Sequence, residues 1–343
     1  MTMAQLSLLF LLVAYSVAVS ARSFRRQEDT FTNPINQAKG ADPCMRLING
    51  TYFMTSTQNT DISMWMSDTV EGLHTAEKIT LFTDDTEGRN FDFWAPEFWY
   101  LDGTWYIYYA VAGNYDDNTH RMHVLRGGTD EADPSTGPYE YVGPLIPDNF
   151  DTWAVDGSIL ELDDARYFVF SGQQTDTPWT QCLYISAMSD PVTLTGDAQI
   201  ISCPEYTWET AATPVQEGPE PITYDGTTYI VYSASHCSTI DYALGLLTLT
   251  TGANPMLAAS WTKNSEPLFS KDEEAGVYGP GHHFMFQTGD GYYFAYHGKT
   301  LEDQYSCGDE RTTRVQPFTF NSTGPVFPAP VAVDVAVPEP SLL

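Results

Sequence analysis

Asp102-Gly103-Thr104-Trp105-Tyr106-Ile107 is a hairpin signal, and four other segments of the 343-residue chain repeat it, at 49–54, 164–169, 225–230 and 290–295. Each segment begins with Asn or Asp, usually followed by Gly, and continues into an aromatic, β-rich run. Gly accepts the positive φ that a tight hairpin requires. Aromatic and β-branched residues suit a pleated, buried strand. The sequence therefore predicts five similar hairpins.

The five turns recur at a nearly constant interval. Their positions at 50, 103, 165, 226 and 291 are separated by 53, 62, 61 and 65 residues. A period of this size indicates a repeated supersecondary unit, and about sixty residues are enough for four short strands of typical length. Radially repeated four-stranded sheets form a β-propeller. We therefore predict an all-β fold, a five-bladed β-propeller; a β-sandwich would not space its hairpins so evenly.

A polar or aromatic residue stands at a matching distance before each turn. Trp94, Asp156, Glu217 and His282 precede their turn positions by nine residues, and Asp42 precedes its own by eight. Because the innermost strand of each blade lines the axis, we expect these side chains to meet there. Neighbouring carboxylates raise one another's pKa, which keeps one of them protonated near neutral pH. An acid and a base on opposite sides of a bond are typical of glycoside hydrolysis.

Five short motifs surround these residues: Ala41-Asp42-Pro43, Trp94-Ala95-Pro96-Glu97, Val155-Asp156-Gly157-Ser158, Glu217-Gly218-Pro219 and Gly279-Pro280-Gly281-His282. In order and spacing they resemble glycoside hydrolase family 43. The resemblance runs from about Asn33 to Pro330. It implies a five-bladed β-propeller, in agreement with the repeat count, and hydrolysis with inversion at the anomeric carbon.

The resemblance also assigns roles to the motif residues. Asp42 matches the general base that activates water, and Glu217 matches the general acid. Asp156 matches the residue that raises the pKa of the acid and orients it. His282 matches a channel histidine that often lies near a bound cation such as calcium, so it is also the candidate metal ligand. The chemistry itself requires no cofactor.

Further motifs are similar to the fungal-type α-L-arabinofuranosidase branch of that family: Tyr206-x-Trp208-Glu209, Trp261-Thr262-Lys263, Val277-Tyr278-Gly279 and Arg311-Thr312-Thr313-Arg314-Val315-Gln316. The resemblance implies that Arg311 or Arg314 reaches the sugar. The other candidate substrate-binding residues are Trp94, Ser158 and His282. Three residues depart from the family pattern, and they bear on fine specificity: Cys44, His283 and Glu220.

The sequence favours an exo-acting α-L-arabinofuranosidase whose substrate is plant cell-wall arabinan, arabinoxylan or an arabino-oligosaccharide. A β-xylosidase and an endo-arabinanase of the same family remain alternatives, because the loops around the pocket decide among these substrates. A non-catalytic sugar-binding propeller would use the same aromatic residues, but it has no need for three acids at the axis. An acidic structural protein would leave that cluster unexplained.

Charge and composition limit the partners. The chain carries 15 basic and 45 acidic residues, a formal net charge of −30. Such a field repels nucleic-acid phosphates and anionic membrane surfaces. We therefore expect a neutral partner, no nucleic acid and no membrane association, and a monomer.

The chain ends and the cysteines indicate an exported protein. Residues 6–20 form an apolar run, and small residues precede a cleavage position after Ala21, which is typical of a signal peptide over residues 1–21. Further processing is expected after Arg26, which leaves residues 27–343 as a single catalytic domain. Sequons at Asn49 and Asn321 fit export. Among five cysteines, Cys182 with Cys203 and Cys237 with Cys307 are the expected disulfides, with one cysteine left over. The alternating stretch 331–337 favours a strand that helps close the ring.

Overall fold

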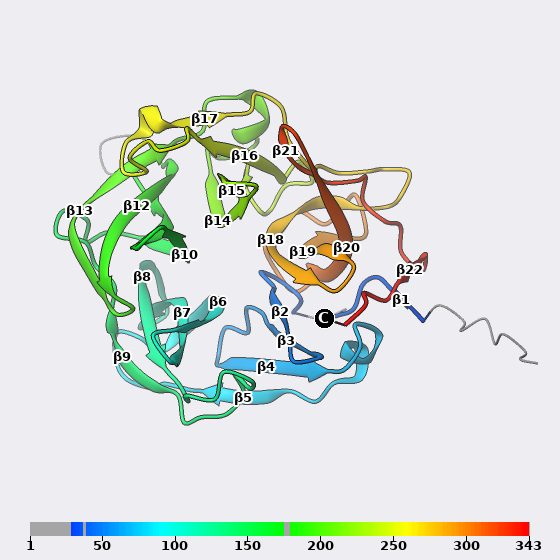
Figure 1. Cartoon of the computed structure of the whole chain (residues 1–343), viewed down its shortest axis with the longest axis horizontal. Helices are drawn as coiled ribbons and strands as arrows, with labels where there is room; N and C mark the ends of the chain where they lie inside the picture. The colour runs from blue at the N-terminus through cyan, green and yellow to red at the C-terminus, as the bar shows by residue number, and fades with distance from the viewer. Residues whose placement is uncertain (1–28, 37–38, 175–178, 343) are drawn as a thin grey trace, which may run out of the picture.

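The computed structural model describes residues 29–36, 39–174 and 179–342 and contains five antiparallel four-stranded sheets arranged in a ring (Figure 1). The innermost strands are β2 (Cys44–Ile48), β6 (Phe91–Leu101), β10 (Ala154–Leu162), β14 (Gln216–Tyr224) and β18 (Tyr278–Thr288). Their neighbours are β3 (Thr51–Thr55), β7 (Thr104–Gly113), β11 (Ala165–Gln173), β15 (Thr227–Ala234) and β19 (Gly291–Lys299). The five-bladed β-propeller is thus confirmed.

The outer half of each blade follows the same order. The third strands are β4 (Ile62–Ser67), β8 (Asp116–Arg126), β12 (Gln181–Asp190), β16 (Ala243–Leu249) and β20 (Thr312–Asn321). The outermost strands are β5 (Ile79–Phe82), β9 (Glu140–Pro144), β13 (Thr193–Ser202), β17 (Trp261–Lys263) and β21 (Gly324–Val326). Helix in the described residues is confined to three short 3-10 segments, η1 (Glu71–Thr75), η2 (Thr207–Glu209) and η3 (Ala258–Ser260). None of these is long enough to cross a membrane.

A positive-φ residue stands at the same distance before the first turn of every blade, and in the second to fifth blades it lies at an irregularity of the innermost strand. A two-residue turn joins the first two strands, at 49–50, 102–103, 163–164, 225–226 and 289–290. Eight residues before the second turn position, the backbone has a positive φ of 44–57° at Asp42, Ala95, Asp156, Gly218 and His282. In the second to fifth blades two residues at this point oppose one on the neighbouring strand; Ala95 and Pro96, for example, lie opposite Tyr109 alone, between the pairs Trp94–Ala110 and Glu97–Tyr108. This is a β-bulge, which bends a strand and re-aims its side chains.

The positions of the turns show that the sequence repeats of the third and fifth blades are aligned one residue too late. The turns of the third and fifth blades are at 163–164 and 289–290, one residue earlier than Ala165 and Gly291. The aromatic runs of the two hairpins look alike in either alignment, so similarity of sequence did not reveal the shift. The true equivalents of Asp42 in the second and fourth blades are Ala95 and Gly218. Trp94 and Glu217 each precede the bulge residue by one position.

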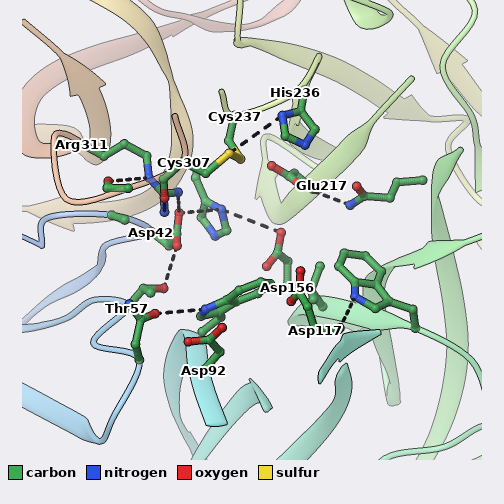
Figure 2. Close-up of a pocket in the computed structure, with 18 of the residues that line it drawn as sticks. Asp42, Thr57, Asp92, Asp117, Asp156, Glu217, His236, Cys237, Cys307 and Arg311 are labelled. Carbon is green, nitrogen blue, oxygen red and sulfur yellow. Dashed lines mark hydrogen bonds and ion pairs between the residues drawn. A yellow bond between two sulfur atoms is a disulfide. The ribbon is translucent and has the colours of Figure 1, made fainter. Parts of the chain in front are cut away.

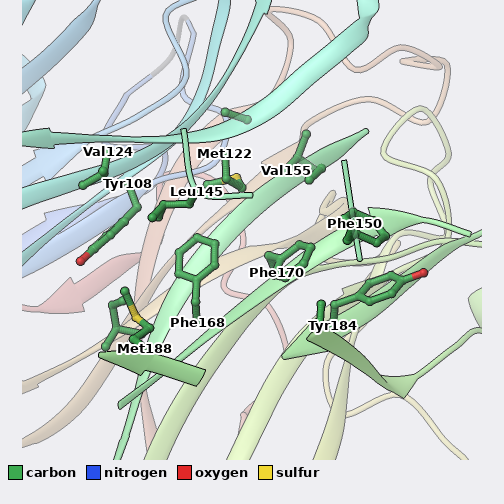
Figure 3. Packing of buried hydrophobic residues seen from close by; sticks show 14 of the residues in the cluster. Tyr108, Met122, Val124, Leu145, Phe150, Val155, Phe168, Phe170, Tyr184 and Met188 are labelled. Carbon is green, nitrogen blue, oxygen red and sulfur yellow. The ribbon is translucent and has the colours of Figure 1, made fainter. Parts of the chain in front are cut away.

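Five apolar clusters fill the interfaces between neighbouring blades. The cluster between the second and third blades is representative, and Tyr108, Met122, Phe168 and Phe170 lie at its centre (Figure 3). Tyr108 on β7 and Phe168 on β11 have ring centroids 5.6 Å apart, which joins the two blades directly. Each blade therefore buries both of its faces against its neighbours.

The two ends of the described chain close the ring together. β1 (Thr30–Thr32) pairs antiparallel with β22 (Ala336–Pro338). The side chain of Asn33 then donates to the carbonyl of Val315 on β20 at 2.8 Å and accepts from its N–H at 2.8 Å. The strand expected over 331–337 is wrong for most of that stretch, because residues before Ala336 form turn and coil.

The cysteine predictions are confirmed. Disulfides join Cys182 to Cys203 and Cys237 to Cys307, and Cys44 is free and buried. The sequon asparagines Asn49 and Asn321 are exposed at turns of the first and fifth blades, where their glycosylation stays a prediction. The expected cleavage sites after Ala21 and Arg26 lie outside the described residues.

Replacing Asn33 by Ala should lower the free energy of unfolding by about 2–4 kcal/mol, because two buried hydrogen bonds are lost and Val315 keeps unpaired backbone groups. Chemical denaturation of the purified protein measures this difference. The control is Gln199→Ala, an exposed amide on β13, for which a change within about 0.5 kcal/mol is expected. Equal stability of the two variants would contradict a role of Asn33 in ring closure.

Candidate active site

A pocket of about 600 Å³ opens at the end of the ring where the five positive-φ residues lie. This volume is in the range of small-molecule sites. All five blades contribute residues to its lining, among them Asp42, Trp94, Asp156, Glu217, His282 and Arg311. Figure 2 shows Asp42, Asp156 and Glu217 directed toward the same space, from three different blades.

Asp42 is held as a charged carboxylate. Thr57 donates to its Oδ2 at 2.6 Å, and Arg311 donates through Nη1 to its Oδ1 at 3.0 Å. The Nδ1 atoms of His282 and His297 each lie 3.2 Å from Oδ1. Burial alone would raise the pKa of Asp42, but Arg311 and the two histidines together hold it well below its usual value. Asp42 is therefore ionised at any pH near neutrality and is able to accept a proton.

Glu217 has a different environment, with two neutral donors. Tyr242 donates its hydroxyl to Oε1 at 2.8 Å. Gln181 donates its side-chain amide to Oε2 at 3.1 Å and also to the hydroxyl of Ser171 at 3.2 Å. These contacts fix the orientation of the carboxyl group without placing a positive charge in hydrogen-bond contact with it.

Asp156 lies between the base and the acid. Its Oδ2 accepts the N–H of Gly218, the residue after Glu217, at 3.1 Å, and lies 3.8 Å from Nδ1 of His282. Burial, together with the negative charges of Glu217 and Asp42, raises the pKa of Asp156 to about 7 against the opposing effect of His282. Asp156 therefore keeps its own proton up to about neutral pH, and it lies beside the half-buried Glu217.

His282 packs into this carboxylate cluster. Its backbone N–H donates to the hydroxyl of Ser233 at 2.7 Å, which fixes the bulge. Burial would lower the pKa of the imidazole, but the charges of Asp42, Asp156 and Glu217 raise it. A positive ring here compensates part of the acidic charge of the pocket.

The axial donors give little support to a calcium site. Calcium takes six to eight oxygen ligands, whereas the described residues against His282 offer the carboxylates of Asp42 and Asp156, and Asp42 already contacts Arg311. This donor set does not fit a directly coordinated calcium ion. The one group of three metal donors found within the described ranges is His236, Cys237 and Cys307, whose sulfurs are joined in a disulfide.

Aromatic side chains form one wall of the pocket. Trp94 stacks on His120 with ring centroids 3.9 Å apart, and its Nε1 donates to Asn59 at 3.1 Å. Trp153 and Trp179 meet edge to face at 5.2 Å, and both line the pocket. The expected sugar-stacking position of Trp94 is therefore in the pocket, with its ring held by two neighbours.

Two of the candidate substrate-binding residues do not line the pocket. Ser158 is fully buried below the pocket, where its hydroxyl lies 3.3 Å from Oε2 of Glu220. Two residues apart on a regular strand, Ser158 and Asp156 would share a face, but the bulge between Val155 and Ser158 interrupts this alternation. Arg314 is fully buried inside the fifth blade, on β20 beside Tyr296, and does not line the pocket. Of the two arginines, Arg311 is the one at the pocket.

The three departures from the family pattern lie beneath the pocket. Cys44, His283 and Glu220 are buried and none of them lines it. Burial and the nearby carboxylate of Glu97 raise the pKa of Glu220, and burial raises the pKa of Glu97 to about 7. Burial lowers the pKa of His283 to about 3, so this ring is neutral.

Sequence reasoning missed four residues that contact the acids: Thr57, Gln181, Tyr242 and His297. Thr57 follows β3, Gln181 begins β12, Tyr242 precedes β16, and His297 lies near the end of β19. They lie near one end of the second or third strands of their blades. The available signal was positional, namely polar residues at the strand ends that face the bulge.

Comparison with known proteins agrees with this geometry. The model of the family described as glycosyl hydrolases family 43 matches residues 31–326. An extracellular exo-α-(1→5)-L-arabinofuranosidase of Streptomyces avermitilis is 34% identical over 88% of this chain and 64% of its own length. The α-L-arabinofuranosidase 43 of Humicola insolens is 33% identical over 85% of this chain and 62% of its own length. The chain therefore spans somewhat less than two thirds of these relatives.

Solved structures share the architecture. The crystal structure of an α-L-arabinofuranosidase from Lactobacillus brevis superposes with a TM-score of 0.81 at 29% identity, covering 89% of this chain and 98% of that one. An endo-arabinase from Bacteroides thetaiotaomicron, 16% identical with a TM-score of 0.64 over 86% of this chain and 99% of that one, shows the same fold. With a family model matched over most of its length and relatives of 33–34% identity, the chain belongs to glycosyl hydrolases family 43.

Proposed function

We propose that the protein is an inverting, exo-acting α-L-arabinofuranosidase that releases arabinose from plant cell-wall arabinan or arabinoxylan. The observation that carries the proposal is that the surroundings of two acids in one pocket shift their pKa values in opposite directions. Arg311 and two histidines keep Asp42 charged, whereas burial and the charges of Glu217 and Asp42 raise the pKa of Asp156 to about 7. The names of the relatives support the choice of sugar.

Asp42 would act as the general base. The pocket leaves its carboxylate in contact with donors on both oxygens, so the group is fixed in direction before the substrate arrives. A water between Asp42 and the anomeric carbon would lose its proton to the carboxylate while its oxygen forms the new bond. An inverting enzyme requires about 6.5–9.5 Å between the two carboxyls to make room for this water.

Glu217 would act as the general acid on the opposite side of the bond. Its proton would pass to the leaving oxygen as the glycosidic bond breaks, so the oxocarbenium-like transition state never releases an alkoxide. Tyr242 and Gln181 hold the carboxyl in place, and Asp156 would regulate its protonation. Trp94 would offer its ring to the sugar.

We also propose that the protein is secreted and monomeric and that catalysis needs no cofactor. The apolar N-terminal run, the two disulfides and the names of the extracellular relatives support export. The base, the acid and the pKa-regulating carboxyl are all side chains of this chain, and none of the proposed steps passes through an ion.

The first prediction concerns substrate and acid together. The wild type should hydrolyse an aryl α-L-arabinofuranoside faster than an aryl β-D-xyloside. Glu217→Gln should lower kcat/KM by about 10²–10⁴-fold on a substrate whose leaving group needs a proton. Release of reducing sugar from arabino-oligosaccharide measures this loss. Wild-type activity on the xyloside alone would contradict the arabinofuranosidase and favour a β-xylosidase. Sugar binding without hydrolysis of either substrate would favour the non-catalytic sugar-binding propeller.

The second prediction concerns Asp156. Two interacting carboxyls lose their protons in two steps, and the first charge delays the second loss. Asp156→Asn removes this coupling, so the alkaline limb of the kcat/KM profile should move to lower pH and the rate at neutral pH should fall. Initial rates between pH 3 and 9 measure both effects. An unchanged alkaline limb would contradict a role of Asp156 in the protonation of the acid.

The third prediction concerns metal ions. Incubation with EDTA followed by gel filtration should leave kcat within about twofold of the untreated enzyme, because the proposed proton transfers use side chains only. Added calcium should not raise the rate. A large loss on chelation that calcium restores would show that an ion supports the active site.

A further inference from the structure

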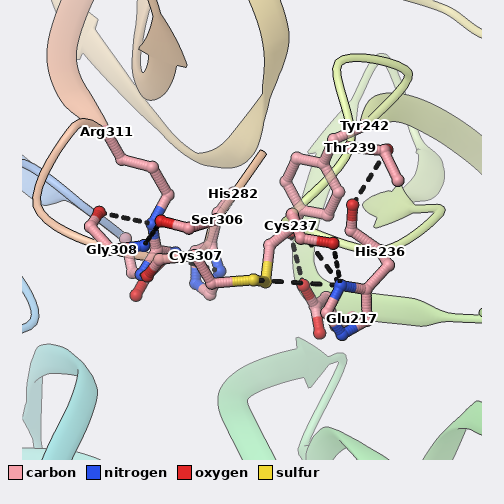
Figure 4. The surroundings of a disulfide bond; sticks show 12 residues. Glu217, His236, Cys237, Thr239, Tyr242, His282, Ser306, Cys307, Gly308 and Arg311 are labelled. Carbon is pink, nitrogen blue, oxygen red and sulfur yellow. Dashed lines mark hydrogen bonds and ion pairs between the residues drawn. A yellow bond between two sulfur atoms is a disulfide. The ribbon is translucent and has the colours of Figure 1, made fainter. Parts of the chain in front are cut away.

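One disulfide joins the two loops that carry the partners of the base and the acid. The loop 235–242 connects β15 and β16 in the fourth blade and contains Cys237. The loop 300–311 connects β19 and β20 in the fifth blade and contains Cys307. Figure 4 shows the bridge beside Glu217 and His282, and both cysteines line the pocket.

On the base side, Cys307 holds Arg311. The backbone carbonyl of Cys307 accepts a hydrogen bond from Nη2 of Arg311, and Nη1 of the same guanidinium donates to Asp42 at 3.0 Å. The Nε atom is 3.4 Å from the carbonyl of Gly308. The backbone of Arg311 is fixed separately, because the N–H of Gly40 donates to its carbonyl at 3.1 Å. The loop therefore acts on the direction of the guanidinium, through the carbonyl of Cys307.

On the acid side, the loop that contains Cys237 ends at Tyr242, whose hydroxyl donates to Glu217 at 2.8 Å. This loop is also fixed from the fifth blade, because Nζ of Lys299 donates to the carbonyl of Cys237 at 2.8 Å and lies 3.3 Å from that of Thr239. The acid side is thus anchored by both a covalent bond and a buried lysine.

The loop 300–311 has far fewer anchors of its own. Leu301 and Tyr305 are 58% and 63% exposed. The side chain of Gln304 bonds only to backbone N–H groups at positions 300 and 301, within the same loop. Among the described contacts, those that tie residues 301–310 to another blade run through Cys307, in the disulfide and in its sulfur contact with His236 at 3.9 Å.

We propose that the Cys237–Cys307 disulfide is a positioning element of the active site, which fixes the carbonyl of Cys307 and thereby holds the guanidinium of Arg311 against Asp42. The inference rests on the proposed role of Asp42 as the general base. Without the bridge, the loop 300–311 would be tied to the propeller at its two ends only. The guanidinium would then spend part of its time away from Asp42, and the carboxylate would lose its strongest opposite charge.

The test compares the wild type with the Cys237→Ser/Cys307→Ser double variant, which leaves Cys182–Cys203 intact. Because Arg311 lowers the pKa of Asp42, the acidic limb of the kcat/KM profile should move upward by about one pH unit when that contact weakens, a tenfold loss on the acid side of the limb. The matched control is Leu301→Ser/Tyr305→Ser in the same loop, which alters two exposed side chains and should keep the wild-type limb.

A double-mutant cycle distinguishes a specific effect of the disulfide on Arg311 from a general loss of order in the loop 300–311. In an Arg311→Met background, removal of the disulfide should cause no further shift of the acidic limb, because the charge that it positions is already absent. Reduction of the wild type with a phosphine in the presence of EDTA should reproduce the shift, and reoxidation should reverse it. EDTA prevents His236 and the freed thiols from binding stray metal.

Two outcomes would overturn the proposal: an unchanged acidic limb in a folded double variant, or shifts from Arg311→Met and from disulfide removal that simply add. Thermal melting shows whether the double variant is folded. If it is not, the reversible reduction of the wild type decides, because a limb unmoved by complete reduction of this bridge contradicts the proposal equally. Failure of Glu217→Gln or Asp42→Asn to lower activity would instead contradict the catalytic roles.

Discussion

The site depends on one backbone constraint, a left-handed residue at the same distance before the first turn of every blade. Such a φ disfavours most side chains by about 1–2 kcal/mol, and Asp and Asn tolerate it better than others. Three of the five positions carry Asp42, Asp156 and His282, and these are the groups that meet at the axis. The bulge that re-aims them also ends the regular pairing of the strand, so the geometry of the fold and that of the pocket are a single property.

The pocket divides its acids by the charges placed around them. The chain has three acidic residues for every basic one, yet Arg311 and His282 are both directed at Asp42. Asp156 accepts a hydrogen bond from a neutral backbone N–H and lies close to two other acids. Burial raises the pKa of both carboxyls, but only at Asp42 do the positive neighbours outweigh it. A few positively charged groups, used at one carboxylate, are sufficient to separate two acids of the same chemical type.

The repeat and the resemblance predicted the fold and the three acids, because turn residues and motif order are local properties of the sequence. They did not predict which polar side chains of the motifs reach the pocket and which are buried away from it. Ser158 and Arg314 belong to polar motifs, but both are fully buried, one beneath the pocket and one within a blade. Gln181 and Tyr242 reach Glu217 from other strands, which is a matter of register between distant segments. The one-residue error in the third and fifth repeats arose because aromatic runs do not mark the turn itself.

The pairing of β1 with β22 and of Asn33 with Val315 also affects when the protein can complete its fold during synthesis. Asn33 leaves the ribosome 282 positions before its partner Val315, and β22 follows later still. The ring therefore cannot close until these C-terminal segments have been made, and contacts of such long range form slowly. Until then the apolar face of the first blade that packs against the fifth stays exposed to other chains. The time spent as an open ring, rather than the stability of the closed one, would then limit the yield of folded protein.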